Sequence, residues 1–188
     1  MRYLPNGKQM SEADAHTIHE IGIPSLVLME RAALQIVETM HKKNISTEKS
    51  LIVCGSGNNG GDGFAVARLL TEQGKHADVL FAGREASLSE ECRCQKQIVE
   101  NMGISVFTEF PDEEYTVIID AVFGVGLCRE ITGHYKDVID WMNLQDAEKV
   151  AVDIPSGICA ATGKILGTAF RADLTVCICL LYTSDAAD

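Results

Sequence analysis

The sequence predicts an α/β fold: a mostly parallel sheet lies between two layers of helices, and two further helices precede it. Short apolar segments of strand type alternate with helical segments along most of the chain, an alternation typical of a parallel sheet covered on both faces. A glycine-rich segment connects the first predicted strand to the helix that follows it. The chain has 188 residues, of which 46% are hydrophobic, so it is long enough to form one domain with a sizeable core.

Two helices are predicted before the sheet. Residues 8–20 form the first, with Ser11 interpreted as its cap. The second follows Pro24 and carries one apolar stripe at spacings of three and four, formed by Leu26, Met29, Ala33, Ile36 and Met40. This stripe is a packing face, against either the sheet or a second subunit. His16 and His19 share a face of the first helix, but no third ligand is near, so solvent exposure is favoured over a metal site.

Six strands and three more helices follow in alternation. The strands are predicted at residues 51–54, 77–82, 104–107, 115–120, 149–153 and 174–178, and the helices at 64–74, 87–102 and 134–144. Ser87 and Gly103 provide start and stop signals for the second of these helices. The strand 115–120 is nearly all apolar, as expected for a strand buried on both faces.

Charge and composition exclude several classes of protein. The formal net charge of −11 argues against a nucleic-acid partner, because phosphate binding requires a basic face. No apolar run approaches the roughly 20 residues of a membrane span, and the first ten residues lack a signal-peptide core. The seven cysteines form no C-x-x-C pair, so we interpret them as reduced thiols of a cytoplasmic protein and not as a zinc site.

The glycine-rich segment reads Gly55-Ser-Gly-Asn-Asn-Gly-Gly-Asp-Gly63. We expect a loop that turns tightly and lets a ligand approach its backbone, next to the N–H groups at the start of a helix. The segment satisfies G-x-G-x-x-G, but that fingerprint also requires an acidic residue at the end of the second strand. That strand ends in Phe81-Ala-Gly-Arg84, so an ordinary NAD(P)-dependent oxidoreductase is disfavoured.

Polar residues follow three of the predicted strands. Asn58, Asn59 and Asp62 lie in the glycine segment, whereas Asp120 and the pair Asp153 and Ser156 follow later strands. Each of these residues could be only a cap or a turn residue. The carboxyl ends of parallel strands, however, meet at one edge of the sheet. The presence of all these polar residues at that edge therefore favours a functional site. Asn and Ser oxygens with one carboxylate suit a weakly held cation, and a second carboxylate could act as a general acid or base.

Three linked motifs resemble the NAD(P)H-hydrate epimerase family, the YjeF N-terminal domain. They are the segment from Gly55 to Arg68, Asp120-Ala-Val-Phe-Gly-Val-Gly-Leu127, and Ala151-Val-Asp-Ile-Pro-Ser-Gly-Ile158. The segment Leu28-Met-Glu-Arg-Ala-Ala33 is similar to the second helix of the family, and the resemblance extends over residues 5–178. It implies a Rossmann-like α/β/α sandwich. It also implies an isomerase that interconverts the R and S forms of NADHX and NADPHX, which are NADH and NADPH hydrated at C6 of the nicotinamide.

The resemblance further implies roles for individual residues. Asp153 would be the catalytic acid/base, and Asn59, Asp120 and Ser156 would hold a potassium ion. The residues that would contact the substrate are Asn58, Asn59, Gly60, Gly61, Asp62, Gly124, Val125, Gly126, Leu127, Cys128, Arg129, Glu130 and Asp153. A separate NAD(P)H-hydrate dehydratase, fused downstream in many bacterial relatives, would use the S form. We also expect a homodimer formed through the N-terminal helices. The alternative function is a non-catalytic nucleotide- or protein-binding module on the same fold.

The sequence departs from the family pattern at its end. After residues 172–176 the family continues into a loop containing Pro-Lys, whereas this chain continues as Cys177-Ile-Cys-Leu-Leu-Tyr-Thr-Ser-Asp-Ala-Ala-Asp188. We therefore expect one epimerase domain over residues 1–178 and an atypical, truncated or foreign tail over residues 179–188.

Overall fold

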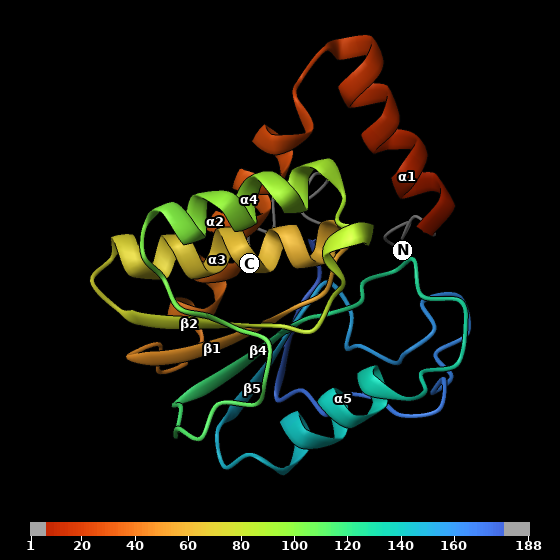
Figure 1. Cartoon of the computed structure of the whole chain (residues 1–188). Helices are drawn as coiled ribbons and strands as arrows, with labels where there is room; N and C mark the ends of the chain where they lie inside the picture. Colours follow the sequence, from red (N-terminus) through yellow and green to blue (C-terminus); the bar gives the residue numbers. More distant parts are fainter. Residues whose placement is uncertain (1–6, 179–188) are drawn as a thin grey trace.

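A six-stranded, all-parallel sheet forms the centre of the computed structural model, which describes residues 7–178 (Figure 1). Its strands are β1 (Lys49–Cys54), β2 (His76–Phe81), β3 (Val106–Phe107), β4 (Val117–Ala121), β5 (Glu148–Val152) and β6 (Leu174–Val176). They are arranged in the order β3-β2-β1-β4-β5-β6, the order of a Rossmann fold, which reverses direction between β1 and β4. The predicted fold class is therefore confirmed, and the predicted tail lies outside the described residues.

Helices cover both faces of the sheet (Figure 1). One layer contains α2 (Ser25–Lys42), α3 (Asn58–Glu72) and α4 (Glu90–Asn101), and α3 contacts the other two. The opposite face is covered by α5 (His134–Leu144). Four residues of the predicted α2 stripe are buried: Met29, Ala33, Ile36 and Met40. The stripe therefore packs in the core of this chain, and Leu26 at its end stays partly exposed.

The N-terminal helix differs in detail from the prediction. An α-helix, α1 (Gly7–His16), continues into a π-helical turn, η1 (Thr17–Ile21), and Gly22 ends it at φ 85°. Ser11 lies inside α1 and does not cap it, so that interpretation was wrong. His16 and His19 are both exposed, as expected. The helix projects beyond the layer formed by α2, α3 and α4 (Figure 1).

The glycine-rich segment is a helix for most of its length, because α3 begins at Asn58 and not near Phe64. Close packing on the sheet explains the glycines. A Cβ atom on Gly60 would lie 2.0 Å from the carbonyl oxygen of Gly55, and one on Gly63 would lie 2.5 Å from Cβ of Ala121. Such separations are far below van der Waals contact, so only glycine allows the start of α3 to come this close.

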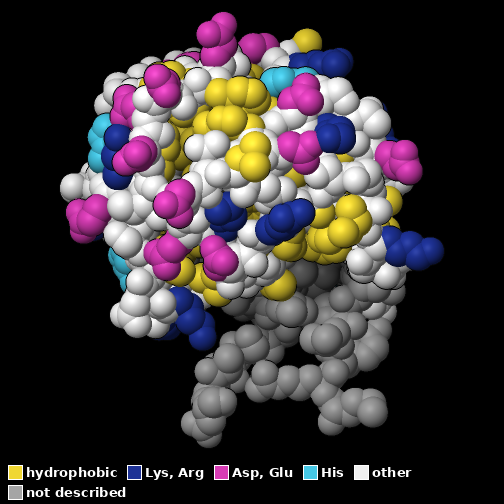
Figure 2. Space-filling model, turned by 90° about the horizontal axis from the view of Figure 1, so that it is seen from below, with side chains coloured by type: hydrophobic (Ala, Val, Ile, Leu, Met, Phe, Trp, Pro, Cys, Tyr) yellow, Lys and Arg dark blue, Asp and Glu magenta, His cyan; other side chains and the backbone are white. Residues whose placement is uncertain are grey.

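The face that carries α5 shows hydrophobic side chains in separate patches among acidic and basic ones (Figure 2). Phe110 stacks on Trp141 there with ring centroids 4.9 Å apart.

The short helix η2 (Glu85–Ser87) lies between β2 and α4 in the sequence. Within residues 7–178, no helix is long and apolar enough to cross a membrane.

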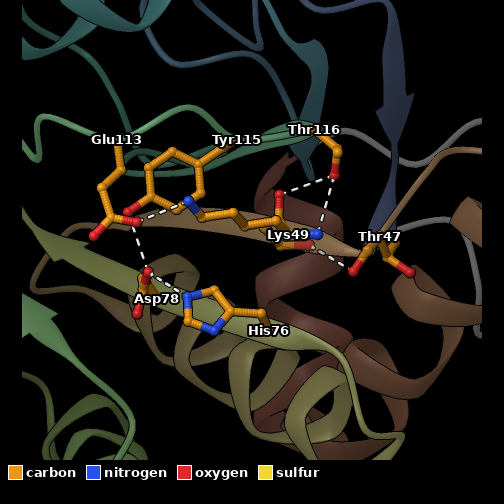
Figure 3. A network of polar contacts seen from close by, with 8 residues as sticks. Thr47, Lys49, His76, Asp78, Glu113, Tyr115 and Thr116 are labelled. Atoms are coloured by element: carbon orange, nitrogen blue, oxygen red, sulfur yellow. Dashed lines mark hydrogen bonds and ion pairs between the residues drawn. The ribbon is translucent and has the colours of Figure 1, made fainter.

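A network of polar contacts lies at the amino ends of the strands of the sheet (Figure 3). Asp78 of β2 is buried, accepts a hydrogen bond of 3.1 Å from the Tyr115 hydroxyl, and lies 2.9 Å from His76 Nε2. Lys49 pairs with Glu113 at 2.7 Å and lies 5.1 Å from the centroid of the Tyr115 ring. Since Lys49 and His76 begin their strands, this network lies at the edge opposite the carboxyl ends.

Candidate active site

A cavity of about 670 Å³ lies beside the carboxyl ends of the central strands, where the strand order reverses. In Rossmann-like sheets this switch point is where ligands bind. The predicted residues that line the cavity are Asn58, Asn59, Asp62, Asp153 and the run from Gly124 to Arg129. Asp120 and Ser156 are fully buried outside its lining.

The buried pair Asp120 and Ser156 joins the loops after β4 and β5. Asp120 Oδ1 accepts a 2.7 Å hydrogen bond from Ser156 Oγ, and Oδ2 accepts one of 2.7 Å from the Ser156 backbone N–H. Ser156 Oγ in turn accepts from the N–H of Phe123 at 2.9 Å. Burial raises the pKa of Asp120 to about 6, and the hydrogen bonds oppose that rise. The two predicted residues therefore fix the backbone on which the cavity wall is built.

Asp153 follows β5 in a left-handed backbone conformation, φ 68°, which is uncommon outside glycine and concentrates at functional positions. Its Oδ2 accepts a 3.0 Å hydrogen bond from the N–H of Val125. Oδ1 is buried and has no hydrogen-bond partner among the described residues. A buried carboxylate oxygen without a partner costs stability, and Asp153 lines the cavity, so a ligand that bonds to this atom would remove that cost.

Asn59 faces the same space from the start of α3. Within residues 7–178, neither its Oδ1 nor its Nδ2 has a hydrogen-bond partner, although both are buried. Gly124 brings Asn59 and Asp153 together: a Cβ at this position would lie 3.3 Å from Asn59 Oδ1 and 2.8 Å from Asp153 Oδ2. An amide and a carboxylate with free hydrogen-bonding capacity thus lie close to the same glycine, an arrangement suited to a polar ligand.

Two further carboxyl groups line the cavity. Burial, reinforced by the charge of Asp153, raises the pKa of Asp62 well above its usual range and raises that of Asp14 as well. A raised pKa favours the protonated form of a carboxyl group, which can donate a hydrogen bond to a ligand. Sequence reasoning missed Asp14 of α1 and Glu91 of α4, which also line the cavity, because no motif surrounds them.

The remaining predicted residues lie around this centre. Gly60 and Gly61 lie within α3 and outside the cavity lining, and a Cβ on Gly61 would lie 2.6 Å from Cε of Met29. Glu130 lines an adjoining cavity. All six described cysteines are free, and Cys92 is buried on α4 whereas Cys94 is partly exposed. The substrate contacts assigned to these residues, like those assigned to every other residue of the site, stay predictions.

The donor set can be tested against the implied potassium ion. Among residues 7–178 no cluster of three or more His, Cys, Asp or Glu could hold a metal ion. Asn59 instead offers a buried, unpartnered amide oxygen, and Asp120 and Ser156 offer a carboxylate and a hydroxyl oxygen with lone pairs to spare. Neutral oxygens with one carboxylate suit a weakly held, hard cation, so the residues present fit the ion.

Comparisons with known proteins show which family the sequence matches. The family described as YjeF-related protein N-terminus matches residues 25–183. A protein from Weissella koreensis named NAD(P)H-hydrate epimerase is 43% identical over 169 residues, which cover 89% of this chain and 76% of its own. One of the same name from Limosilactobacillus reuteri is 44% identical over 175 residues, covering 92% and 82%.

Among solved structures, yeast YNL200c shares the fold with a TM-score of 0.81 and 20% sequence identity, covering 94% of this chain and 80% of that one.

Proposed function

The chain belongs to the family of YjeF-related N-terminal domains, and on that premise we propose that it interconverts the R and S epimers of hydrated NADH and NADPH. This is the activity for which its curated relatives are named. The enzyme is an isomerase of nicotinamide cofactor repair. The observation that carries the proposal is that Asp153 and Asn59, which both line the switch-point cavity, have buried polar atoms without a hydrogen-bond partner among the described residues.

Epimerisation at C6 requires a group that donates a proton when the hydroxyl leaves and regains a proton after water adds. In the hydrate, C6 carries a hydroxyl and is bonded to the ring nitrogen N1. The carboxyl group of Asp153 protonates that hydroxyl as the C6–O bond breaks, and the N1 lone pair stabilises the cation that forms. Water then adds to the opposite face of C6 and releases a proton to solvent, and the Asp153 carboxylate takes up a proton from solvent, which restores the enzyme. Atoms balance, because one water leaves and one enters.

The surrounding residues orient the ring for this exchange. The Val125 N–H binds one carboxylate oxygen of Asp153 and leaves the other free for the substrate. The amide of Asn59, which also lies close to Gly124, can hydrogen-bond a polar group of the nicotinamide. Burial raises the pKa of Asp62, which favours the protonated form of this carboxyl group, the form that can donate a hydrogen bond to the substrate.

We assign potassium to Asn59, Asp120 and Ser156. When bound, it would supply positive charge that orders the loops after β1, β4 and β5. The buried carboxylate of Asp120 and the unpartnered oxygen of Asn59 support this assignment. Replacing potassium with choline in the buffer is expected to lower the melting temperature and the rate of epimerisation. Equal values in both buffers would remove the ion from the proposal.

The proposal includes a homodimer built on the N-terminal helices. Ile21, Val27 and Leu34 are exposed there by 60%, 45% and 48%, and burying such side chains on a second copy would stabilise a dimer. Leu34→Asp is expected to shift the sedimentation coefficient from dimer to monomer. Leu144→Asp is the matched control, since Leu144 is 82% exposed on α5. A wild-type chain that sediments as a monomer would refute the dimer.

The functional partner is the dehydratase that consumes the S epimer, and the site of action is the cytoplasm. Six free cysteines among the described residues suit a reducing compartment.

The decisive experiment follows conversion of purified R-hydrated NADH to the S form by chromatography. Asp153→Asn suits the left-handed backbone, because Asn tolerates φ near 60° better than Ala does. We expect this variant to lose about 10²- to 10⁴-fold in rate, the usual contribution of a general acid or base. Asp146→Asn, at an exposed position, is the control and should keep full activity. A folded wild-type chain that gives no S epimer would refute the enzyme and favour the binding module.

A further inference from the structure

A second cavity, of about 620 Å³, adjoins the first and shares part of its wall. Ser56, Ser87 and Arg129 line both cavities. The second cavity reaches toward the end of β2, where Arg84 lines it, and toward Tyr135 of α5. The two cavities therefore adjoin along the carboxyl edge of the sheet, with Asp153 lining the first and Arg84 lining the second.

The two cavities differ in charge. The first is lined by Asp14, Asp62, Glu91 and Asp153, with Arg129 as its cation, whereas the second carries both Arg84 and Arg129 against the single acid Glu130. Arg84 is exposed and makes no ion pair with any residue of the described chain. Arginine outnumbers acidic residues only in the second cavity, so the phosphates of a dinucleotide are attracted more strongly to the second cavity than to the first.

Arg84 lies just beyond the second strand of the sheet. In Rossmann-like sheets, the residue just beyond the second strand contacts the ribose of the adenosine. An acid there binds the 2′-hydroxyl of NAD, and an arginine nearby accommodates the 2′-phosphate of NADP. Here β2 ends at Phe81 and Arg84 follows three residues later. Asp153 follows β5, on the other side of β1, where the nicotinamide half would then lie.

Local contacts hold the Arg84 backbone against the glycine-rich segment. Ser87 Oγ donates a 3.0 Å hydrogen bond to the carbonyl oxygen of Arg84 and lies 3.1 Å from Ser56 Oγ. The N–H of Ser89 donates to the carbonyl oxygen of Ser56 at 2.9 Å. The backbone of the loop that carries Arg84 is therefore held in a fixed position relative to the start of α3.

We infer that the second cavity binds the adenosine half of the substrate and that Arg84 binds its 2′-phosphate, which makes NADPHX the better substrate of this chain. The inference rests on the proposed function and adds a determinant of specificity to it. Arg84 acts far from C6. Its contact is therefore made equally in the ground state and in the transition state, and its loss raises KM without lowering kcat.

The first test compares the kinetics of R-NADPHX and R-NADHX. For the wild-type chain we expect kcat/KM to favour R-NADPHX by about tenfold, the equivalent of 1.4 kcal/mol. In Arg84→Ala this advantage should disappear through a higher KM for R-NADPHX, with R-NADHX changed by less than about twofold. Arg171→Ala, which removes an equal charge outside both cavities, is the control and should keep the wild-type ratio. An unchanged ratio in Arg84→Ala overturns the inference.

The second test measures binding and does not depend on turnover. Adenosine 2′,5′-bisphosphate and adenosine 3′,5′-bisphosphate carry the same charge and differ only in the position of one phosphate. Calorimetry should show about tenfold tighter binding of the 2′,5′ isomer to the wild-type chain and equal binding of both to Arg84→Ala. If the chain distinguishes the isomers but epimerises neither hydrate, the proposed function fails and the phosphate site stands. If it epimerises both hydrates equally and does not distinguish the isomers, the site fails and the function stands.

Discussion

Gly60→Ala tests whether the glycines of α3 serve packing and not flexibility. Alanine is usually about 1 kcal/mol better than glycine inside a helix, so propensity alone predicts a more stable protein. The structure predicts the opposite. The new Cβ would lie 2.0 Å from the Gly55 carbonyl oxygen and 2.7 Å from the carbonyl carbon. These are backbone atoms that no rotamer change can move, so the start of α3 must shift by roughly 1 Å to restore a normal contact.

The magnitude follows from these opposing effects. Overpacking a tight site costs about 1–3 kcal/mol and sometimes more. A backbone clash belongs at the upper end of that range, so after the gain in propensity we expect a net loss of about 2 kcal/mol. For a chain of this length that loss corresponds to a melting temperature roughly 4–8 °C lower. The shift also displaces the adjacent Asn59, and a misplacement of about 1 Å can cost on the order of 10²-fold in rate.

The assay is urea unfolding followed by circular dichroism, with Gly57→Ala as the matched control. A Cβ on Gly57 meets nothing within 4 Å, and its φ of −87° is accessible to alanine. Gly57 is the N-cap of α3, where alanine is less favourable than glycine, so the control should lose no more than about 1 kcal/mol. If Gly60→Ala proved as stable as Gly57→Ala at equal m values, the packing explanation would be refuted.

Three further substitutions test other features. Tyr115→Phe removes the hydrogen bond to the buried Asp78 carboxylate and should cost about 1.5–3 kcal/mol in urea unfolding while kcat/KM stays unchanged, because the pair lies at the edge opposite the cavity. Ser89→Ala removes the side-chain cap that accepts from the N–H of Cys92 and should cost about 1 kcal/mol; no loss would mean that water replaces the cap. Burial and nearby carboxylates raise the pKa of Asp62 above 3.8, so its stabilising contribution is present at low pH and is lost as pH rises through the raised pKa. The free energy of unfolding of Asp62→Asn should therefore increase relative to that of the wild type as the pH rises from 4 to 8. Parallel curves of unfolding free energy against pH would contradict the raised pKa of Asp62.

The order and type of the elements could be predicted from the sequence because apolar strands alternate with helices of clear periodicity. That alternation also implied that Asp120 and Ser156 follow strands at one edge of a parallel sheet, and their hydrogen bond confirms that they meet. The start of α3 could not be predicted, because glycine has low intrinsic helix propensity and only the contact with Gly55 explains its presence.

The outer parts of the site depend on tertiary placement. Asp14 reaches the cavity because α1 and its π-helical turn bring it there, and no local pattern encodes that position. Arg84 was noted only as the absence of an acidic residue after the second strand. Its importance emerges from the adjoining cavity and from the absence of an ion pair to it in the described chain, and both are properties of the folded molecule.

The position of β1 at the centre of the sheet also has a consequence for how the chain folds. β1 pairs with its sequence neighbour β2, but its other partner is the distant β4, with Ser50 opposite Val117. Closing so long a loop is slow compared with forming helices or neighbouring strand pairs. The cavity lies where these two strands meet, so it cannot exist until that late pairing is complete. During refolding, recovery of ligand binding should lag behind recovery of helical structure, and a nascent chain cannot capture its substrate before its sheet has closed.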